Sequence, residues 1–137
     1  MNSLRSARRR NKRRKAATAV EIAICLPVLV LLLFAGYELG RANMLHHATE
    51  SAAYEGARVG IVPGANKEKI EEAVKFVLQS VGARDAEIIV TPSVIEKDTA
   101  KVKVLIRVPM KSNSVLAPFF TKETVFEGQC EMTREVF

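Results

Sequence analysis

Glu21 is the residue whose type and position first point to chemistry, because it is a carboxylate close to the start of a long apolar stretch. The segment Ala16–Tyr37 reads AATAVEIAICLPVLVLLLFAGY and holds no other Asp, Glu, Lys, Arg or His. A carboxylate within hydrocarbon is costly and usually marks function. A mild interpretation is that Glu21 complements the dipole of the first helical turn and reaches the headgroups. The alternative interpretation, that Glu21 is a functional residue, depends on the sequence around it, because small residues and a basic run precede it.

The remaining reactive side chains do not converge on a site. His46 and His47 are the only histidines, and adjacent residues on a helix point roughly 100° apart, which suits one metal ion poorly. Cys25 lies in the apolar stretch and Cys130 near the other end of the sequence, so we expect no disulfide between them. We expect Cys130 to be buried in a strand, and the alternative is an intermolecular disulfide.

The sequence also lacks the combinations of residues that enzymes use. It shows no Ser-His-Asp set, no metal cluster, no paired carboxylates with a cleft motif and no phosphate-binding loop. We therefore expect no catalytic residue, no metal, no cofactor and no small-molecule substrate. The chain is predicted not to be an enzyme.

Positive charge is concentrated in one short segment. Residues 1–15 contain eight basic and no acidic side chains, and the other 122 residues contain 13 basic and 15 acidic ones. A nucleic-acid-binding domain would spread basic residues over a folded face, so no nucleic-acid partner is expected. Basic residues directly before an apolar segment hold the N-terminus in the cytoplasm. The predicted topology determinants are Arg8, Arg9, Arg10, Lys12, Arg13, Arg14 and Lys15.

The apolar stretch predicts a transmembrane helix at residues 17–37. Ile22–Tyr37 alone would be about 24 Å long as a helix, and a bilayer core of about 30 Å requires the residues before it as well. The expected protein is single-pass in the cytoplasmic (inner) membrane, with its N-terminus inside and its C-terminus outside. Pro27 has no N–H for the helix, so a kink is expected there.

A cleaved secretory signal is the alternative interpretation of this stretch, because Ala35 and Gly36 form a weak small-residue cleavage site. The basic region is unusually long for such a signal, and the helical pattern continues past Gly36.

The run from the basic segment to Glu21 is similar to the leader of type IV prepilins. The resemblance implies that a prepilin peptidase cuts on the cytoplasmic side between Ala16 and Ala17, which makes Glu21 the fifth residue of the mature chain. Ala16 stands where the commonest pattern has Gly. The resemblance also implies that Glu21 meets the N-terminal ammonium of a neighbouring subunit, and a buried carboxylate is tolerable when it is paired.

Beyond the apolar stretch the pattern becomes amphipathic. It predicts that the same helix continues to about Val59 and stops at Gly60, with Pro63 and Gly64 beyond it. Mostly small residues recur at spacings of three and four and predict a packing seam for close helix–helix or helix–sheet approach. The seam consists of Ala42, Leu45, Ala48, Ala52 and Gly56. The charged residues expected on wetter faces are Arg41, Glu50, Glu55 and Arg58.

The second half of the chain predicts a small α+β domain. Asn66 can cap a second amphipathic helix that ends at Gly82. After Gly82 the hydrophobic period changes from near 3.6 to 2 and predicts a small antiparallel sheet of about three strands, with a loop at 110–122. The expected strands are 87–95, 100–109 and 123–135. The expected buried residues are Ile70, Val74, Val77, Leu78 and Val81 on the helix and Val102, Val104, Ile106 and Val108 on the middle strand.

The chain resembles the TadE-like family, the minor pseudopilins of the tight-adherence (Tad/Flp) pilus machinery. The resemblance rests on AATAVEIAICLPVLVLLLFAGYELGRA after the basic run, on AAYEGARVGIVPGA at 52–65, and more weakly on the tail from Val108. It implies a pilin-like fold, membrane insertion and processing by a prepilin peptidase. It also implies a role in assembling or priming a pilus, with other pilins or pseudopilins of the Tad machinery as partners.

Four segments are therefore expected: a basic cytoplasmic leader at 1–16, a transmembrane helix at 17–37, an extracytoplasmic continuation of that helix at 38–62, and a small α+β domain at 63–137. The main alternative is an unprocessed single-pass anchor that presents a small extracytoplasmic binding domain and forms no polymer.

Overall fold

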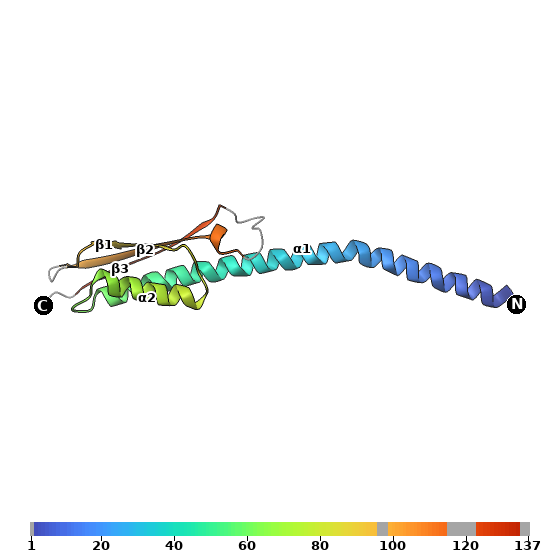
Figure 1. Cartoon of the computed structure of the whole chain (residues 1–137), viewed down its shortest axis with the longest axis horizontal. Coiled ribbons are helices and arrows are strands. Elements are labelled where there is room, and N and C mark those ends of the chain that lie inside the picture. The colour runs from blue at the N-terminus through green and yellow to red at the C-terminus, as the bar shows by residue number, and fades with distance from the viewer. Residues whose placement is uncertain (1, 96–98, 115–122, 135–137) are drawn as a thin grey trace. The chain divides into compact units, whose positions relative to one another are not determined.

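The computed structural model describes residues 2–95, 99–114 and 123–134, with side chains from Lys15 onward. Two compact units are present, Met1–Tyr37 and Glu38–Phe137. The elements follow in the order α1, α2, β1, β2, a short 3₁₀ helix and β3 (Figure 1). The expected α+β class is confirmed, with a long N-terminal apolar helix, a second helix and a three-stranded antiparallel sheet.

Helix α1 spans Asn2–Gly60, a length of 59 residues. The sequence predicts the start of the spanning helix at Ala17, whereas α1 already includes the basic segment. Residues 2–15 contain no Gly or Pro and are rich in Arg and Lys, which are good helix formers, so nothing in this segment interrupts the helix. α1 stops at the predicted Gly60, and Gly64 then turns the chain with a φ of +81°.

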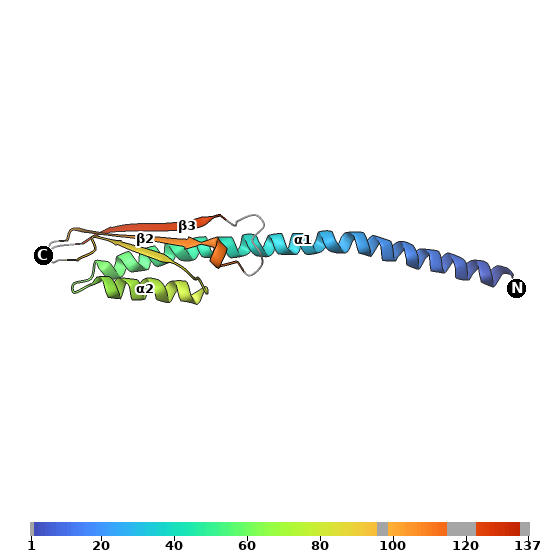
Figure 2. The ribbon, with the colours of Figure 1, turned by 45° about the horizontal axis from the view of Figure 1, so that its top comes forward.

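Within the unit Glu38–Phe137, two helices cover one face of the sheet. Helix α2 (Lys67–Ser80) follows α1 after a short turn and lies beside it in both ribbon views (Figures 1 and 2). The strands are β1 (Glu87–Thr91), β2 (Lys101–Pro109) and β3 (Val125–Thr133). They pair antiparallel in the order β1-β2-β3, so β2 is the central strand of the described sheet and β1 and β3 are its edges.

The strand boundaries differ in detail from those expected. β1 ends at Thr91 rather than at residue 95, because Pro92 has no N–H to give to a strand ladder. The predicted loop at 110–122 begins with a 3₁₀ turn at Met110–Ser112, and its residues 115–122 lie outside the described part of the chain. β3 lies inside the predicted 123–135.

Helix α2 is fixed at both ends by local hydrogen bonds. The Asn66 side-chain oxygen accepts the backbone N–H of Lys69 at 2.9 Å, which is the predicted N-cap. At the other end Gly82 adopts a φ of +62°, its N–H bonds the carbonyl of Gln79, and the N–H of Ala83 bonds that of Leu78, each at 2.9 Å. These two bonds form a Schellman motif and give the last carbonyls of α2 their partners.

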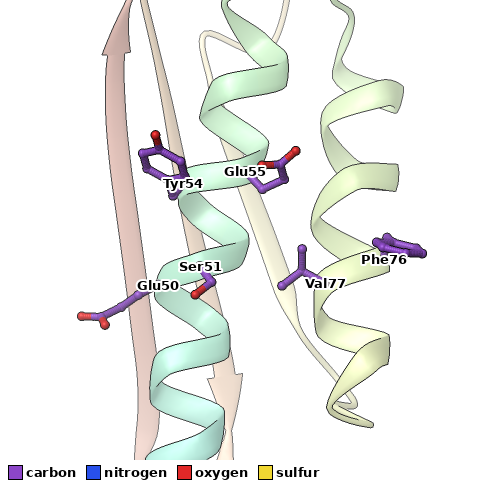
Figure 3. A pocket seen from close by; sticks show the side chains of 6 residues that line it. All are labelled: Glu50, Ser51, Tyr54, Glu55, Phe76 and Val77. Carbon is purple, nitrogen blue, oxygen red and sulfur yellow. The ribbon is translucent and has the colours of Figure 1, made fainter.

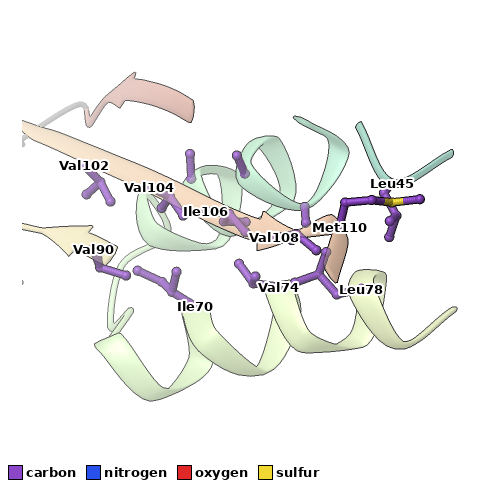
Figure 4. Packing of buried hydrophobic residues seen from close by; sticks show 13 residues of the cluster. Leu45, Ile70, Val74, Leu78, Val90, Val102, Val104, Ile106, Val108 and Met110 are labelled. Carbon is purple, nitrogen blue, oxygen red and sulfur yellow. The ribbon is translucent and has the colours of Figure 1, made fainter. Parts of the chain in front are cut away.

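The core forms where α1, α2 and β2 meet. Alternate residues of β2 face the helices and are fully buried, as their period of two predicts (Figure 4). Ile70, Val74 and Leu78 of α2 are buried as predicted, whereas Val77 and Val81 are only half-buried. α1 contributes mainly small residues to this core. The buried apolar residues around it are Leu45, Ala52, Ala53, Ala57, Val90, Val102, Val104, Ile106, Val108 and Met110.

Two glycines allow α1 to approach its neighbours closely. A Cβ on Gly56 would lie 2.6 Å from Cγ2 of Val74 on α2. A Cβ on Gly128 of β3 would collide with the backbone carbonyl of Thr49 on α1. The Gly56 contact involves a side chain, which can shift, whereas the Gly128 contact involves helix backbone, which cannot.

Replacing Gly128 by Ala should therefore destabilise this unit by about 1–3 kcal/mol, the usual cost of overpacking, and more than Gly56→Ala does. The measurement is hydrogen exchange of β2 backbone amides in the full chain in detergent micelles, which reports opening of the unit. Gly40→Ala is the control, because nothing lies within 4 Å of a Cβ there. Equal stability of the Gly128 and Gly40 variants would contradict the close approach.

Candidate functional site

Glu21 lies on a part of α1 that nothing in the described chain covers. One stretch of α1 is long and apolar enough to cross a membrane, and none of its most apolar window is buried. Val20 and Ile22, beside Glu21, are 59% and 58% exposed. The side chain of Glu21 forms no hydrogen bond or ion pair with any described residue. A carboxylate that enters hydrocarbon is costly unless its charge is paired or neutralised.

The predicted cleavage residues Ala16 and Ala17 are exposed positions within α1, one helical turn before Glu21. Among the predicted topology determinants, Lys15 is exposed, and the side chains of the others lie outside the described part of the structure. These are Arg8, Arg9, Arg10, Lys12, Arg13 and Arg14. The structure thus places Ala16, Ala17 and Glu21 on consecutive turns of one helix.

Pro27 lies inside α1, which continues on both sides of it. Its missing N–H leaves the carbonyl of Ala23 without its usual helical donor, which is the reason for expecting a kink. The kink itself stays a prediction. Cys25 lies on this exposed apolar part of the helix as a free thiol, together with Ile22, Ile24, Leu26, Val28, Leu29 and Leu32.

The residues of the predicted packing seam face the domain of their own chain. Leu45 and Ala52 are fully buried, Ala48 and Gly56 are buried, and Ala42 is half-buried against the same core. This face of α1 is therefore occupied by the sheet and α2 within one molecule. Other parts of the α1 surface are open, with Tyr54 at 56% exposure and, nearer the start of this unit, Leu39 at 63%.

Arg41 is a structural residue that the sequence reasoning placed wrongly on a wet face. It is half-buried, and its guanidinium donates three hydrogen bonds to backbone carbonyls. Nη1 reaches Val81 O at 2.6 Å, Nη2 reaches Gly82 O at 3.0 Å and Nε reaches Asn113 O at 3.1 Å. A cation at the C-terminal end of α2 also complements the helix dipole. A basic residue one turn into the predicted helix continuation 38–62 does not by itself signal such a role.

Asn113 completes this junction from the other side. It is buried, and its Oδ1 accepts the N–H of Arg84 at 2.7 Å. Its Nδ2 donates to the carbonyls of Arg84 and Pro109, each at 2.8 Å. The segments after α2 and after β2 are thereby joined to each other and, through Arg41, to α1.

The two adjacent histidines lie next to a carboxylate of the same helix. His46 Nε2 and His47 Nδ1 each lie 3.7 Å from a different oxygen of Glu50, and all three side chains are largely exposed. No group of three or more potential metal ligands occurs within the described residues. The histidines therefore lie on the open face of α1, where the ring of His46 also lies 6.1 Å from that of Phe126.

A shallow hollow of about 580 Å³ lies between the outer sides of α1 and α2 (Figure 3). Ser51, Glu55 and Val77 line its middle, whereas Tyr54 projects from α1 and Phe76 from the far side of α2. The pKa of Glu55 is lowered by its hydrogen bonds with Arg58. The polar groups do not converge on a common point, as they do in small-molecule sites.

The outer face of the sheet is held by ion pairs between strands. Lys101 Nζ donates to Glu131 Oε1 at 2.8 Å, and Arg107 Nε donates to Glu127 Oε1 at 2.6 Å. The hydrogen bond with Lys101 lowers the pKa of Glu131, and the bond with Glu127 raises the pKa of Arg107. Both pairs link the central strand β2 to the edge strand β3.

Cys130 lies on that same edge strand and is half-buried, so the prediction that it is buried is wrong. Among the described strands β3 has a neighbour on one side only, and its inward side chains Phe126, Cys130 and Met132 are only half-buried. Both cysteines are free, and no disulfide joins Cys130 to Cys25.

The model of the family described as TadE-like protein matches residues 16–58. This part of the chain is TadE-like. The resemblance expected from the sequence is confirmed, and the matched residues run from Ala16 through Glu21 and the packing seam to Arg58. No curated protein and no solved structure matches the chain. The family points to a membrane protein associated with a Tad pilus, and it is not known as a family of enzymes.

Arg41 lies within the TadE-like segment, and its replacement by Lys should destabilise the unit Glu38–Phe137. An ammonium cannot reproduce the fork of three N–H groups, and lost bonds to a charged donor typically cost about 1.5–3 kcal/mol. Hydrogen exchange of β2 amides in the full chain measures the loss. Arg58→Lys is the matched control, because an exposed ion pair such as Arg58–Glu55 contributes at most about 1 kcal/mol. The same small loss in both variants would argue against the junction.

Proposed function

We propose that this chain is a minor pseudopilin that takes part in assembling or priming a Tad-type pilus. It inserts into the cytoplasmic membrane with the N-terminus inside and the domain Glu38–Phe137 outside. The basic residues before Ala16 provide the orientation, because Lys and Arg next to a span favour the cytoplasmic side. The TadE-like match over residues 16–58 supports the association with pilus components.

The observation that carries the proposal is the position of Glu21. It is exposed on an apolar stretch of α1 that the chain itself leaves uncovered, and it forms no ion pair with any described residue. An ionised carboxylate is stable in hydrocarbon only when another group compensates its charge. A positive group from a neighbouring subunit in the membrane would supply that compensation and would select for side-by-side packing of helices.

Cleavage between Ala16 and Ala17 would create such a positive group. It releases the basic leader and leaves an ammonium on Ala17, four residues before Glu21 and hence on the same side of the helix. When parallel helices pack with a small axial shift, the ammonium of one chain comes next to Glu21 of the next. A prepilin peptidase that accepts a small residue at position 16 is the enzyme that this step requires.

The seam from Ala42 to Gly56 is buried by the chain's own sheet and α2, so we do not assign contacts between subunits to it. In the proposed assembly the contacts within the membrane come from the uncovered stretch of α1. Outside the membrane, the exposed positions of α1, such as Leu39 and Tyr54, remain available.

Ala16→Leu should block processing, because a bulky residue then precedes the scissile bond. N-terminal sequencing of the full-length product purified from membranes is expected to find Ala17 first in the natural chain and the intact N-terminus in the variant. Ala19→Leu is the control, because it places the same side chain after the bond and should be processed. An intact N-terminus in the natural chain would favour the unprocessed single-pass anchor instead.

Glu21→Ala should leave membrane insertion unchanged and abolish assembly, because one acidic group fewer makes insertion easier while the paired charge is lost. Carbonate extraction of membranes measures insertion, and cross-linking between subunits in membranes together with counts of surface pili measures assembly. Glu21→Asp keeps the charge on a shorter side chain and should retain part of the assembly. Normal pilus counts in the Ala variant would exclude the proposed pairing.

A further inference from the structure

Strand β3 ends the described sheet with a long edge that no described strand covers. It spans nine residues and contains no Pro, no Lys and no Arg, and it pairs with β2 one residue to one, without a bulge. Natural proteins usually protect exposed edges by Pro, Lys, bulges or short length. The other edge strand, β1, has only five residues and is followed by Pro92. Of the two edges of the described sheet, the β3 edge is thus the one that can pair with a further strand.

The register defines which backbone groups point outward from this edge. The Met110 N–H bonds Thr124 O at 2.9 Å, and the Arg134 N–H bonds Ala100 O at 2.8 Å, on either side of the β2–β3 ladder. Hydrogen-bonded pairs alternate along an antiparallel ladder, so even-numbered residues of β3 bond β2. The odd-numbered residues direct N–H and C=O away from the sheet. They are Val125, Glu127, Gln129, Glu131 and Thr133, and all five are exposed.

The side chains of β3 specify what kind of strand can bind there. Its outer face presents Glu127 and Glu131, so a neighbouring strand gains from Lys or Arg at the opposite positions. β2 already meets this requirement on the other side, where the register places Arg107 opposite Glu127 and Lys103 opposite Glu131. On the inner face Phe126, Cys130 and Met132 are only half-buried, and alternate aliphatic side chains would cover them.

We propose that the β3 edge binds an extended segment of another protein in which aliphatic residues alternate with Lys or Arg. The segment adds a fourth strand by bonding the outward groups of the odd-numbered residues, and its basic side chains meet Glu127 and Glu131. A second copy of β3 fits poorly, because antiparallel pairing centred on Gln129 sets Glu127 of one copy against Glu131 of the other. The proposal goes beyond the role in pilus assembly and holds whether or not the leader is removed.

The probe is the capped peptide KVKVLIRVP, which has the sequence of Lys101–Pro109 and the required alternation. It is titrated into the isotope-labelled full-length chain in zwitterionic micelles, and amide shifts are followed by NMR. We expect shifts in residues 125–133, largest at the odd-numbered amides. A peptide with its three basic residues replaced by Glu should bind roughly tenfold more weakly or worse, because two favourable pairs become repulsive. Equal binding of both peptides would overturn the proposal.

Gln129→Pro tests the backbone contact directly. It removes one outward N–H and leaves the ladder to β2 intact, so peptide binding should be lost while the β2 amide spectrum is preserved. Gln129→Ala keeps the N–H and should bind normally. Binding that persists in Gln129→Pro, or shifts confined to other elements, would place the peptide elsewhere. Shifts of residues 125–133 that depend on protein concentration without peptide would identify a second copy as the occupant and refute a basic strand.

Discussion

The close approach of α1 to the sheet is the constraint on which the unit Glu38–Phe137 depends. The backbone of Thr49 fills the space in front of Gly128, so a side chain there would have to move an element, and the Val74 side chain fills the space in front of Gly56, so a side chain there would have to displace it. Because α1 offers Ala and Gly here, the volume of the core comes from the branched residues of β2 and α2. Packing at this density resists even one added methyl group. The small-residue seam therefore packs against the sheet and α2 of its own chain.

This constraint separates two uses of one helix. In the unit Met1–Tyr37 the apolar side chains of α1 have no partner within the described chain, and they suit a lipid environment or other helices. Between Ala42 and Gly60 most of the residues that face the core are small, and the side of the helix turned away from the core is exposed. Large aliphatic residues would separate α1 from the sheet, whereas small residues in the apolar stretch would weaken its partition into hydrocarbon. The change in residue size along α1 follows from the change in what surrounds it.

Hydrophobic periodicity predicted the elements, because each buries one face and repeats at its own period. The stop at Gly60, the cap at Asn66 and the alternation of β2 follow from local rules that need no tertiary information. Those rules did not predict the burial and contacts of Arg41, Asn113 and Cys130. Arg41 is half-buried because the end of α2 and the turn after β2 meet around it, and Cys130 is half-buried because the chain places β3 at an edge. Both outcomes depend on topology, which a one-dimensional pattern does not encode. Gly128 gave the only usable signal, since a glycine within a strand often marks the close approach of another backbone.

Buried polar side chains of the unit Glu38–Phe137 find hydrogen-bond partners within the chain, whereas the side chain of Glu21 in the other unit finds none among the described residues. This difference indicates which unit would need partners from outside. In the described part of the chain no buried side-chain nitrogen or oxygen lacks a hydrogen bond, and the domain satisfies Thr49, Asn113 and the last carbonyls of α2 from its own residues. Glu21 has no such provision within the described residues, although its position on an apolar helix makes an uncompensated charge far more costly. A domain that needs nothing from outside can fold before its partners arrive. In the proposed membrane arrangement, the charge of Glu21 raises the free energy of the helix until a partner compensates it. The proposed requirement for association therefore falls on the helix.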